Sequence, residues 1–187
     1  MEKKDLLKDV IKHIDIKSYN STELVDAMRN MSFTSRDTAR AADILMMMCK
    51  EKECTNILTL AGSTSAAGCM QVYVDMVRNK MIDVVVATGA SIIDMDLFEA
   101  LGFKHYIGEK ENVIPDTTLR DLYIDRIYDT YIDEEELQAC DHSTYELANM
   151  LEARPYSSRE FIYEIGKWLH NGKAVKKDSL IQTCLQE

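Results

Sequence analysis

Two short runs of small and hydroxyl-bearing residues are the strongest candidates in this sequence for a ligand-binding site. The first run extends from Ala61 to Gly68 (AGSTSAAG) and the second from Thr88 to Ser91 (TGAS). Small residues let a ligand approach the backbone, while free N–H groups and hydroxyls bind phosphate or ribose oxygens. The runs predict a nucleotide site, and tight packing of a helix on a strand is the alternative explanation. The candidate residues are Ser63, Thr64, Ser65, Thr88, Gly89 and Ser91.

Two acidic residues, Asp94 and Asp96, follow the second run at the start of its helix. As functional residues they could bind an amine or the hydroxyls of a ribose, and as structural residues they would cap the helix. Other signatures are absent: the sequence has no GxGxxG, no GxxxxGKS/T, no GxSxG and no HExxH. The four histidines show no metal spacing and the five cysteines form no CxxC pair, so we predict no metal site.

A strand–helix–strand–helix order positions the two runs. Residues 54–60 and 82–87 are predicted to be buried strands, the second almost unbroken in β-branched residues. Helices are expected over 68–78 and from about 94 to 101. Alternation of this kind is typical of a parallel sheet, which binds ligands at the carboxyl ends of its strands. The predicted fold class is therefore α/β, a Rossmann-like parallel sheet with flanking helices.

The remaining segments are predicted to be mostly helical. Capping signals indicate helices that begin near positions 20, 34, 133 and 157, and a last helix is expected over 180–185. Residues 1–19 are expected to form an arm or a first helix, and residues 108–119 a surface loop. Two strands make a thin sheet for so many helices, so a further strand is expected to follow Leu185.

The composition is that of one globular domain. The chain has 187 residues, of which 46% are hydrophobic and 29% are charged. Its net charge of −10 argues against nucleic acid, which requires a basic face, and would suit a cationic ligand. No apolar run reaches the roughly 18 residues of a membrane span, and the charged first residues do not resemble a signal peptide. We therefore expect a cytoplasmic protein with no membrane partner.

Several of these stretches together resemble the deoxyhypusine synthase family, in particular its deoxyhypusine-synthase-like branch in bacteria and archaea. They are MSFTSRD from position 31, LAGSTSAAG from 60, DVVVATGASIIDMDLFEAL from 83, YIDRIYDTYIDEEELQACD from 123 and RPYSSREFIYEIGKWL from 154. The resemblance implies that residues 1–187 are the N-terminal, NAD-binding part of such a domain, with residues 1–30 as an N-terminal helical arm.

The resemblance also implies a transferase activity with NAD as cofactor. Members of the family oxidise spermidine at a secondary amine and pass its aminobutyl group through an enzyme lysine. In the synthase proper the acceptor is one lysine of translation initiation factor 5A, and in some related bacterial enzymes it is putrescine, which gives homospermidine. Family members are tetramers with active sites between subunits.

By position, the resemblance assigns cofactor contacts to both runs. The implied NAD-binding residues are Gly62, Ser63, Thr64, Ser65, Ala66, Thr88, Gly89 and Ala90. The family follows the second run with two glutamates, where this chain has residues 93–96, so Asp94 and Asp96 are the candidate substrate-binding residues and Asp94 is the credible substitute. The Thr-Ser-Asn of the family's first turn is replaced by Ala61-Gly62-Ser63. These departures indicate the bacterial-type branch and leave the acceptor open.

The family's catalytic half is not present in this sequence. That half carries acidic polyamine ligands, a glycine-rich turn with a histidine, and the catalytic lysine in a Trp-Gly-Lys motif, whereas Gly166-Lys167-Trp168 has a different order. No catalytic residue is therefore predicted here. The leading hypothesis is a split enzyme in which a second chain completes the sheet and supplies the lysine, as heterodimers in a tetramer-like assembly. The alternatives are a homospermidine synthase component, a non-catalytic regulatory or scaffold subunit, and a truncated gene product.

Overall fold

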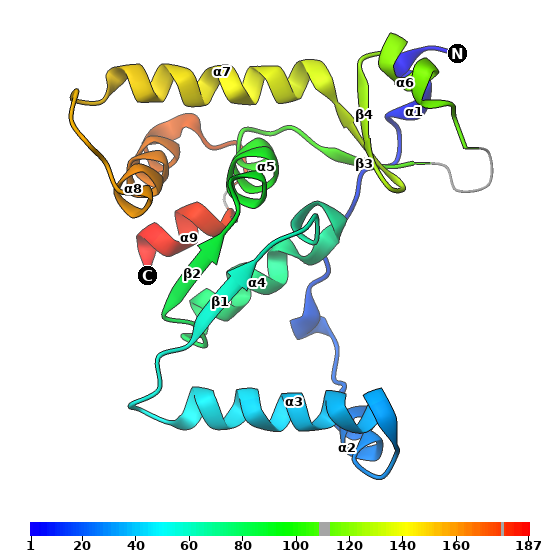
Figure 1. Ribbon diagram of the computed structural model, residues 1–187, viewed down its shortest axis with the longest axis vertical. Coiled ribbons are helices and arrows are strands. Elements are labelled where there is room, and N and C mark those ends of the chain that lie inside the picture. Colours follow the sequence, from blue (N-terminus) through cyan, green and yellow to red (C-terminus); the bar gives the residue numbers. More distant parts are fainter. Residues whose placement is uncertain (109–112, 177) are drawn as a thin grey trace.

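Two small sheets organise the fold of this chain (Figure 1). The computed structural model describes residues 1–108, 113–176 and 178–187. The parallel sheet pairs β1 (Ile57–Leu60) with β2 (Val84–Ala87), and the antiparallel sheet has the order β3 (His105–Ile107), β5 (Thr130–Asp133), β4 (Ile124–Ile127). The predicted α/β class is confirmed, but the parallel sheet has two strands and the antiparallel sheet was not predicted.

The parallel sheet contains the two strands that the sequence predicts, with shorter bounds. Ile57 pairs with Val84 and Leu60 with Ala87, so both strands run in the same direction and end together. Just before both strands, the Asn56 N–H donates to the Asp83 carboxylate over 2.7 Å and the Asp83 N–H donates to the Asn56 carbonyl over 2.9 Å. The carboxyl ends of the two strands therefore lead into the two runs of small residues at one edge of the sheet.

Only one face of the parallel sheet is buried, so the prediction of two buried strands is wrong for the other face. On the outer face Ile57, Val84 and Val86 are 57%, 42% and 54% exposed. The inner face packs Leu60 against Met70 and Val74 of α4. A strand alternates its side chains between two faces, and the described part of the chain places helices on the inner one.

The helical elements include all four helices predicted from capping signals, but the caps at Asn20 and Thr34 are not confirmed, because the helices there follow Ser21 and Ser32 with no side-chain cap. They are α1 (Lys3–Leu6), η1 (Ile16–Ser18), α2 (Thr22–Met28), α3 (Phe33–Lys50), η2 (Ser65–Cys69), α4 (Met70–Arg78), η3 (Ala90–Leu97), α5 (Phe98–Ala100), α6 (Asp116–Asp121), α7 (Glu134–Met150), α8 (Ser158–Trp168), η4 (Leu169–Lys173) and α9 (Leu180–Gln186). Asp133 caps α7 by accepting from the Glu135 and Glu136 N–H groups, and Ser157 with Glu160 forms a capping box on α8. The predicted helices near 133 and 157 are therefore confirmed with their caps.

The predicted loop is wrong in part, whereas residues 1–19 form an arm, which was one of the two predicted alternatives. Within the predicted loop 108–119, residues 116–121 form α6, while positions 109–112 lie outside the described residues. Residues 1–30 contain the short helices α1 and α2, and an extended stretch between them bridges from Val10 to Tyr106 of β3. A single helix over residues 1–19 does not form because this stretch bonds to the antiparallel sheet instead.

The described residues form three core clusters that connect these elements. The largest packs Phe98 of α5 against α7, α8 and α9, a second lies between α4, α9 and the parallel sheet, and a third joins α1 and α6 to the antiparallel sheet. Helices α2 and α3 lie apart from these layers in Figure 1, and α3 leaves Met46 and Met47 more than half exposed. In the described part of the chain no helix is long and apolar enough to cross a membrane.

Candidate functional site

The two runs of small residues lie side by side at the carboxyl end of the parallel sheet. The Thr88 N–H, immediately after β2, donates to the Leu60 carbonyl at the end of β1 over 3.1 Å. Each run continues into a helical segment: η2 begins within the first run at Ser65, η3 begins within the second run at Ala90, and these two segments contact one another. We call residues 61–68 the first turn and residues 88–91 the second turn.

The first turn combines an open backbone with a buried hydroxyl that has no partner. Gly62 has φ +72°, which favours glycine, and a Cβ placed on it would meet no atom within 4 Å. Ser65 is 1% exposed, and its Oγ has no hydrogen-bond partner among the described residues. The Tyr73 hydroxyl of α4 lies 2.8 Å from Thr64 Oγ1 and fixes its position. Ser63 is half-buried and Ala66 is buried.

The second turn begins η3 with its own hydroxyl cap. The Ser91 N–H donates to Thr88 Oγ1 over 3.3 Å, and the two hydroxyls lie 3.1 Å apart. Gly89 has helical backbone (φ −53°), and no atom lies within 4 Å of a Cβ built there. Gly89 and Ala90 are exposed. Because the first N–H groups of a helix have no partner within it, this end of η3 offers donors beside an open surface.

The two turns fit the groups that a dinucleotide presents. Open space at Gly62 and Gly89 lets a phosphate or ribose approach both backbones, and the unpaired Ser65 hydroxyl can donate to or accept from a ligand oxygen. An unpaired buried hydroxyl carries a desolvation cost, which a ligand would relieve. The structure thus brings the eight residues 62–66 and 88–90 together at one edge of the sheet.

The two candidate substrate carboxylates have different environments. Asp96 is 1% exposed, and its two carboxylate oxygens accept from the Leu180 and Ile181 N–H groups of α9, each over 2.8 Å. Burial raises the pKa of Asp96 to about 6, against the effect of these two bonds. Both Asp96 oxygens thus bind the start of α9, and Leu180 lies 84 residues along the chain from Asp96.

Asp94, in contrast, accepts no hydrogen bond from the N–H groups of α9 among the residues that the structure describes. It is half-buried, and burial together with the charge of Asp141 raises its pKa. A cationic amine placed beside Asp94 would favour its charged form. Of the two acidic candidates, Asp94 is therefore the one suited to contact a ligand.

Sequence reasoning missed the contribution of Tyr73, whose hydroxyl reaches Thr64 from α4. The spacing of nine residues gives no recognisable signal, because it depends on how the first turn folds back. Lys167 lies on α8, where it pairs with Glu164, and a Cβ on Gly166 would lie 3.3 Å from Leu185 Cβ of α9. The Gly166-Lys167-Trp168 segment is thus part of the packing between α8 and α9.

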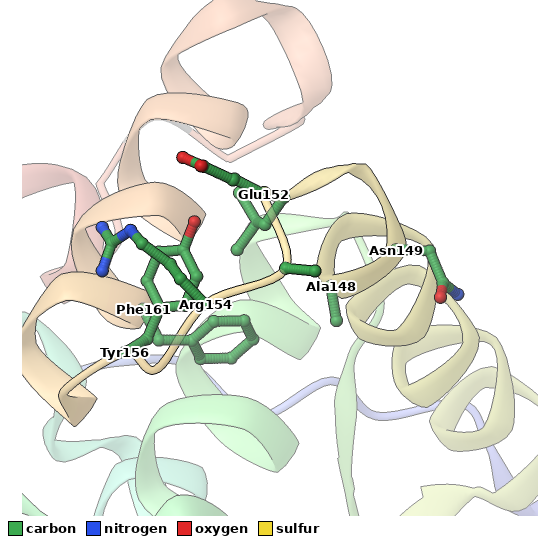
Figure 2. Close-up of a pocket in the computed structure, with 8 residues that line it drawn as sticks. Ala148, Asn149, Glu152, Arg154, Tyr156 and Phe161 are labelled. Carbon is green, nitrogen blue, oxygen red and sulfur yellow. The ribbon is translucent and has the colours of Figure 1, made fainter.

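A surface hollow of about 340 Å³ lies elsewhere, between the end of α7 and the start of α8 (Figure 2). In it the Arg154 guanidinium stacks 3.8 Å from the centre of the Tyr156 ring, and Phe161 forms part of the wall. None of the residues of the two turns lines this hollow. Among the residues that the structure describes, no group of three or more His, Cys, Asp or Glu is placed to hold a metal ion.

Comparison with known proteins gives one consistent family. The family model described as deoxyhypusine synthase matches residues 23–187. A deoxyhypusine synthase-like protein of Caulobacter vibrioides is 63% identical over 186 residues, which are 100% of this chain and 50% of that protein. A protein of the same description from Coxiella burnetii is 59% identical over 184 residues, 98% of this chain and 52% of the relative. The chain thus spans about half the length of these curated relatives.

The fold is also similar to a solved structure. A crystal structure assigned as a deoxyhypusine synthase from Entamoeba histolytica matches with a TM-score of 0.57 and 20% sequence identity. The match covers 94% of this chain and 61% of that one. At this identity the likeness concerns the arrangement of elements alone.

Proposed function

This chain belongs to the deoxyhypusine synthase family, and we propose that it forms the NAD-binding half of a deoxyhypusine-synthase-like transferase. The observation that carries the proposal is the meeting of two open, hydroxyl-bearing turns at the carboxyl end of the parallel sheet. Ligands of open parallel sheets bind at this end of the strands. The proposed cofactor residues are those of positions 62–66 and 88–90.

In the proposed complex the two turns contribute in the same way. The backbone at Gly62 and at Gly89 would lie against the phosphates and riboses, since neither position has a neighbour within 4 Å of a Cβ. The Ser65 and Thr88 hydroxyls would bond to cofactor oxygens. Bound NAD would supply a hydride acceptor for the oxidation of a polyamine. The chain's own contribution is to bind and orient the cofactor.

We further propose that Asp94 orients the polyamine. It lies on η3, seven residues after Ala87 at the end of β2, and its raised pKa reflects burial and the nearby Asp141 charge. Spermidine is a polycation, so an ammonium group beside Asp94 would be paired with a carboxylate at the edge of the cofactor site. The net charge of −10 would favour accumulation of such a cation.

A second chain would supply the catalytic lysine and cover the parallel sheet. Two observations support this arrangement: the apolar outer face at Ile57, Val84 and Val86 is open, and the curated relatives are about twice as long as this chain. Exposed apolar side chains gathered on one face of a sheet are suited to contact with a partner. We propose heterodimers in a tetramer-like assembly, with a lysine of translation initiation factor 5A as the aminobutyl acceptor.

Reconstitution tests this function. The chain is co-expressed with the C-terminal half of the Caulobacter vibrioides relative, and NAD reduction is followed at 340 nm with and without spermidine. We expect reduction that depends on both spermidine and the second half. A complex that forms but gives no spermidine-dependent reduction, or two halves that do not associate, would contradict the proposal.

The same assay decides between acceptors. Translation initiation factor 5A or putrescine is added, and the product is identified by mass spectrometry as a deoxyhypusine-containing protein or as homospermidine. We expect the modified protein. If homospermidine is the only product, putrescine is the acceptor, and the proposed cofactor role of this chain is unaffected.

A further inference from the structure

A segment near the N-terminus, residues 9–17, connects the antiparallel sheet to the first turn; it has no helix before Ile16, where it enters η1, and we call it the arm. The Ile107 N–H donates to the Asp9 carbonyl over 2.7 Å, and the Ile11 N–H donates to the His105 carbonyl over 2.9 Å. Further along, the Ile14 N–H donates to the Gly68 carbonyl over 2.9 Å. In Figure 1 the arm is the blue segment that descends from the antiparallel sheet past the parallel one.

The arm lies directly against the first turn. Gly68 has φ +98°, and a Cβ built on it would lie 3.0 Å from the Lys12 carbonyl oxygen. The Lys17 ammonium then pairs with the buried Asp75 of α4 at 2.7 Å. Gly68 ends the first turn, three residues after the unpaired Ser65 hydroxyl. The backbone conformation of this turn therefore depends on what lies behind it.

A cluster of four side chains fastens the arm at His13, one residue before the contact with Gly68. Glu99 of α5 accepts from three groups: His13 Nε2 at 2.6 Å, His105 Nδ1 at 3.0 Å and the Lys176 ammonium at 2.6 Å. The four residues also line a cavity of about 290 Å³. The cluster joins the arm, α5, β3 and the segment before α9, and we call it the latch.

Glu99 is the centre of the latch. Burial alone would raise its pKa, but hydrogen bonds from His105, His13 and Lys176 hold the pKa of Glu99 well below its usual range, so the group is a carboxylate. In the described part of the chain, the other ring nitrogens, His13 Nδ1 and His105 Nε2, have no partner. Both rings thus depend on Glu99, and loss of this carboxylate would leave buried donors unpaired.

We propose that Glu99 is a positioning residue that latches the arm and, through the arm, holds the first turn in its cofactor-binding conformation. The proposal rests on the proposed function of that turn. If the arm supports the bound conformation, arm attachment strengthens NAD binding, and NAD strengthens arm attachment by the same factor. Glu99 itself touches neither turn and acts through His13 and the backbone of residues 12–14.

The test removes the latch from the arm side and then restores it. His13→Ala deletes the donor to Glu99, whereas His13→Gln keeps an N–H donor at a similar reach. Glu99→Gln removes the charge on the other side, and Glu164→Gln, which breaks an ion pair with Lys167 on α8, is the matched control. The measurements on the full chain are the NAD dissociation constant by calorimetry and hydrogen exchange of the Ile14 amide without NAD.

We expect His13→Ala to weaken NAD binding about tenfold and to accelerate exchange at Ile14, with Glu99→Gln acting in the same direction. His13→Gln and Glu164→Gln should stay within about twofold of the parent chain, since they preserve the latch. Faster exchange in His13→Ala with unchanged NAD affinity would overturn the positioning role, and unchanged exchange would overturn the latch itself. If the parent chain binds no NAD, the proposed function fails and the positioning role with it, while exchange at Ile14 still decides the latch.

Discussion

The inner and outer faces of the parallel sheet are both largely apolar in sequence, with Thr59 on the outer one, and they differ in what covers them. On the inner face Leu60 is 6% exposed and packs with Met70 and Val74 of α4, while on the outer face Val86 is 54% exposed. Leu60 of β1 and Val86 of β2 lie on opposite faces of the sheet and thus have opposite environments. Strand composition therefore indicates which surfaces can be buried. It does not indicate which element covers each surface.

This difference explains why the site is at the end of the sheet. The inner layer, α4 with α9, fixes where both strands end, and the two turns begin there. Residues that build the inner layer should control stability, those of the turns should control cofactor affinity, and those of the outer face should control association.

The largest effect is expected on the inner face. Leu60→Ala removes a buried side chain from the cluster of α4 and α9, so we expect the free energy of unfolding to fall by about 2–5 kcal/mol. Urea denaturation followed by circular dichroism measures it. A loss below about 1 kcal/mol would show that this face is loosely packed, and the contrast between the faces would disappear.

The next effect concerns Asp96, which attaches α9 to η3 over the inner layer. Asp96→Asn leaves one of the two α9 N–H groups without an acceptor, so we expect a loss of about 1–3 kcal/mol in the free energy of unfolding. Urea denaturation of both proteins at pH 7 gives this loss directly.

Comparing the pH dependence of stability in the parent chain and in Asp96→Asn shows the contribution of the Asp96 carboxylate. The pKa of Asp96 is about 6 in the folded chain, above the ordinary 3.8, so the folded state binds this proton more tightly than the unfolded state. The parent chain should therefore gain about 1 kcal/mol relative to Asp96→Asn when the pH falls from 7 to 5. Glu99, whose pKa is lowered, contributes its stability above its ordinary pKa of 4.5 and loses it only as the pH falls further. Identical pH dependence in the two proteins would refute the assignment.

At the first turn the expected effect is on cofactor affinity and not on stability. Ser65→Ala deletes a buried hydroxyl that has no partner, so the folded chain should lose no stability. NAD binding should weaken about tenfold, which corresponds to about 1.4 kcal/mol. Calorimetric titration measures it, with Ser143→Ala on α7 as a control. Weakened folding together with unchanged NAD binding would give Ser65 a structural role.

The smallest effect on folding is expected on the outer face. Val86→Thr keeps the shape of a half-exposed side chain, so the free energy of unfolding of the chain alone should change by less than about 0.5 kcal/mol. Association with the complementary half should nevertheless weaken, because a hydroxyl would then be buried at the contact. Analytical ultracentrifugation of the mixture measures this. Unchanged association would indicate that the second half does not cover this face.

The sequence predicted what is local and failed where distant residues meet. The caps at Asp133 and Ser157 and the order of β1, β2 and their helices depend on neighbouring positions, and they are confirmed. The antiparallel sheet has strands of three and four residues. Its hairpin turns at Tyr128 with φ +54°, a conformation that favours glycine, and no glycine at this position indicates the turn in the sequence. Such short strands carry too little periodicity to be recognised.

The same distinction applies to the candidate site. Runs of small and hydroxyl residues indicate turns in the sequence. The role of Asp96, in contrast, depends on its contact with α9. The latch likewise joins four separate segments through His13, Glu99, His105 and Lys176. Each of these histidines alone resembles an ordinary core or surface residue. Their contact with a shared carboxylate follows only from the three-dimensional arrangement.

Titration of NAD into the parent chain and into Gly89→Leu tests most directly that the two turns bind the cofactor. Gly89 has helical backbone and open space around it, so a leucine should fold normally while filling the volume proposed for the ligand. Ser158→Leu, at the exposed first position of α8, is the control. We predict saturable binding to the parent chain and the control, and none to Gly89→Leu. Equal binding by all three proteins, or binding by none, would contradict the account.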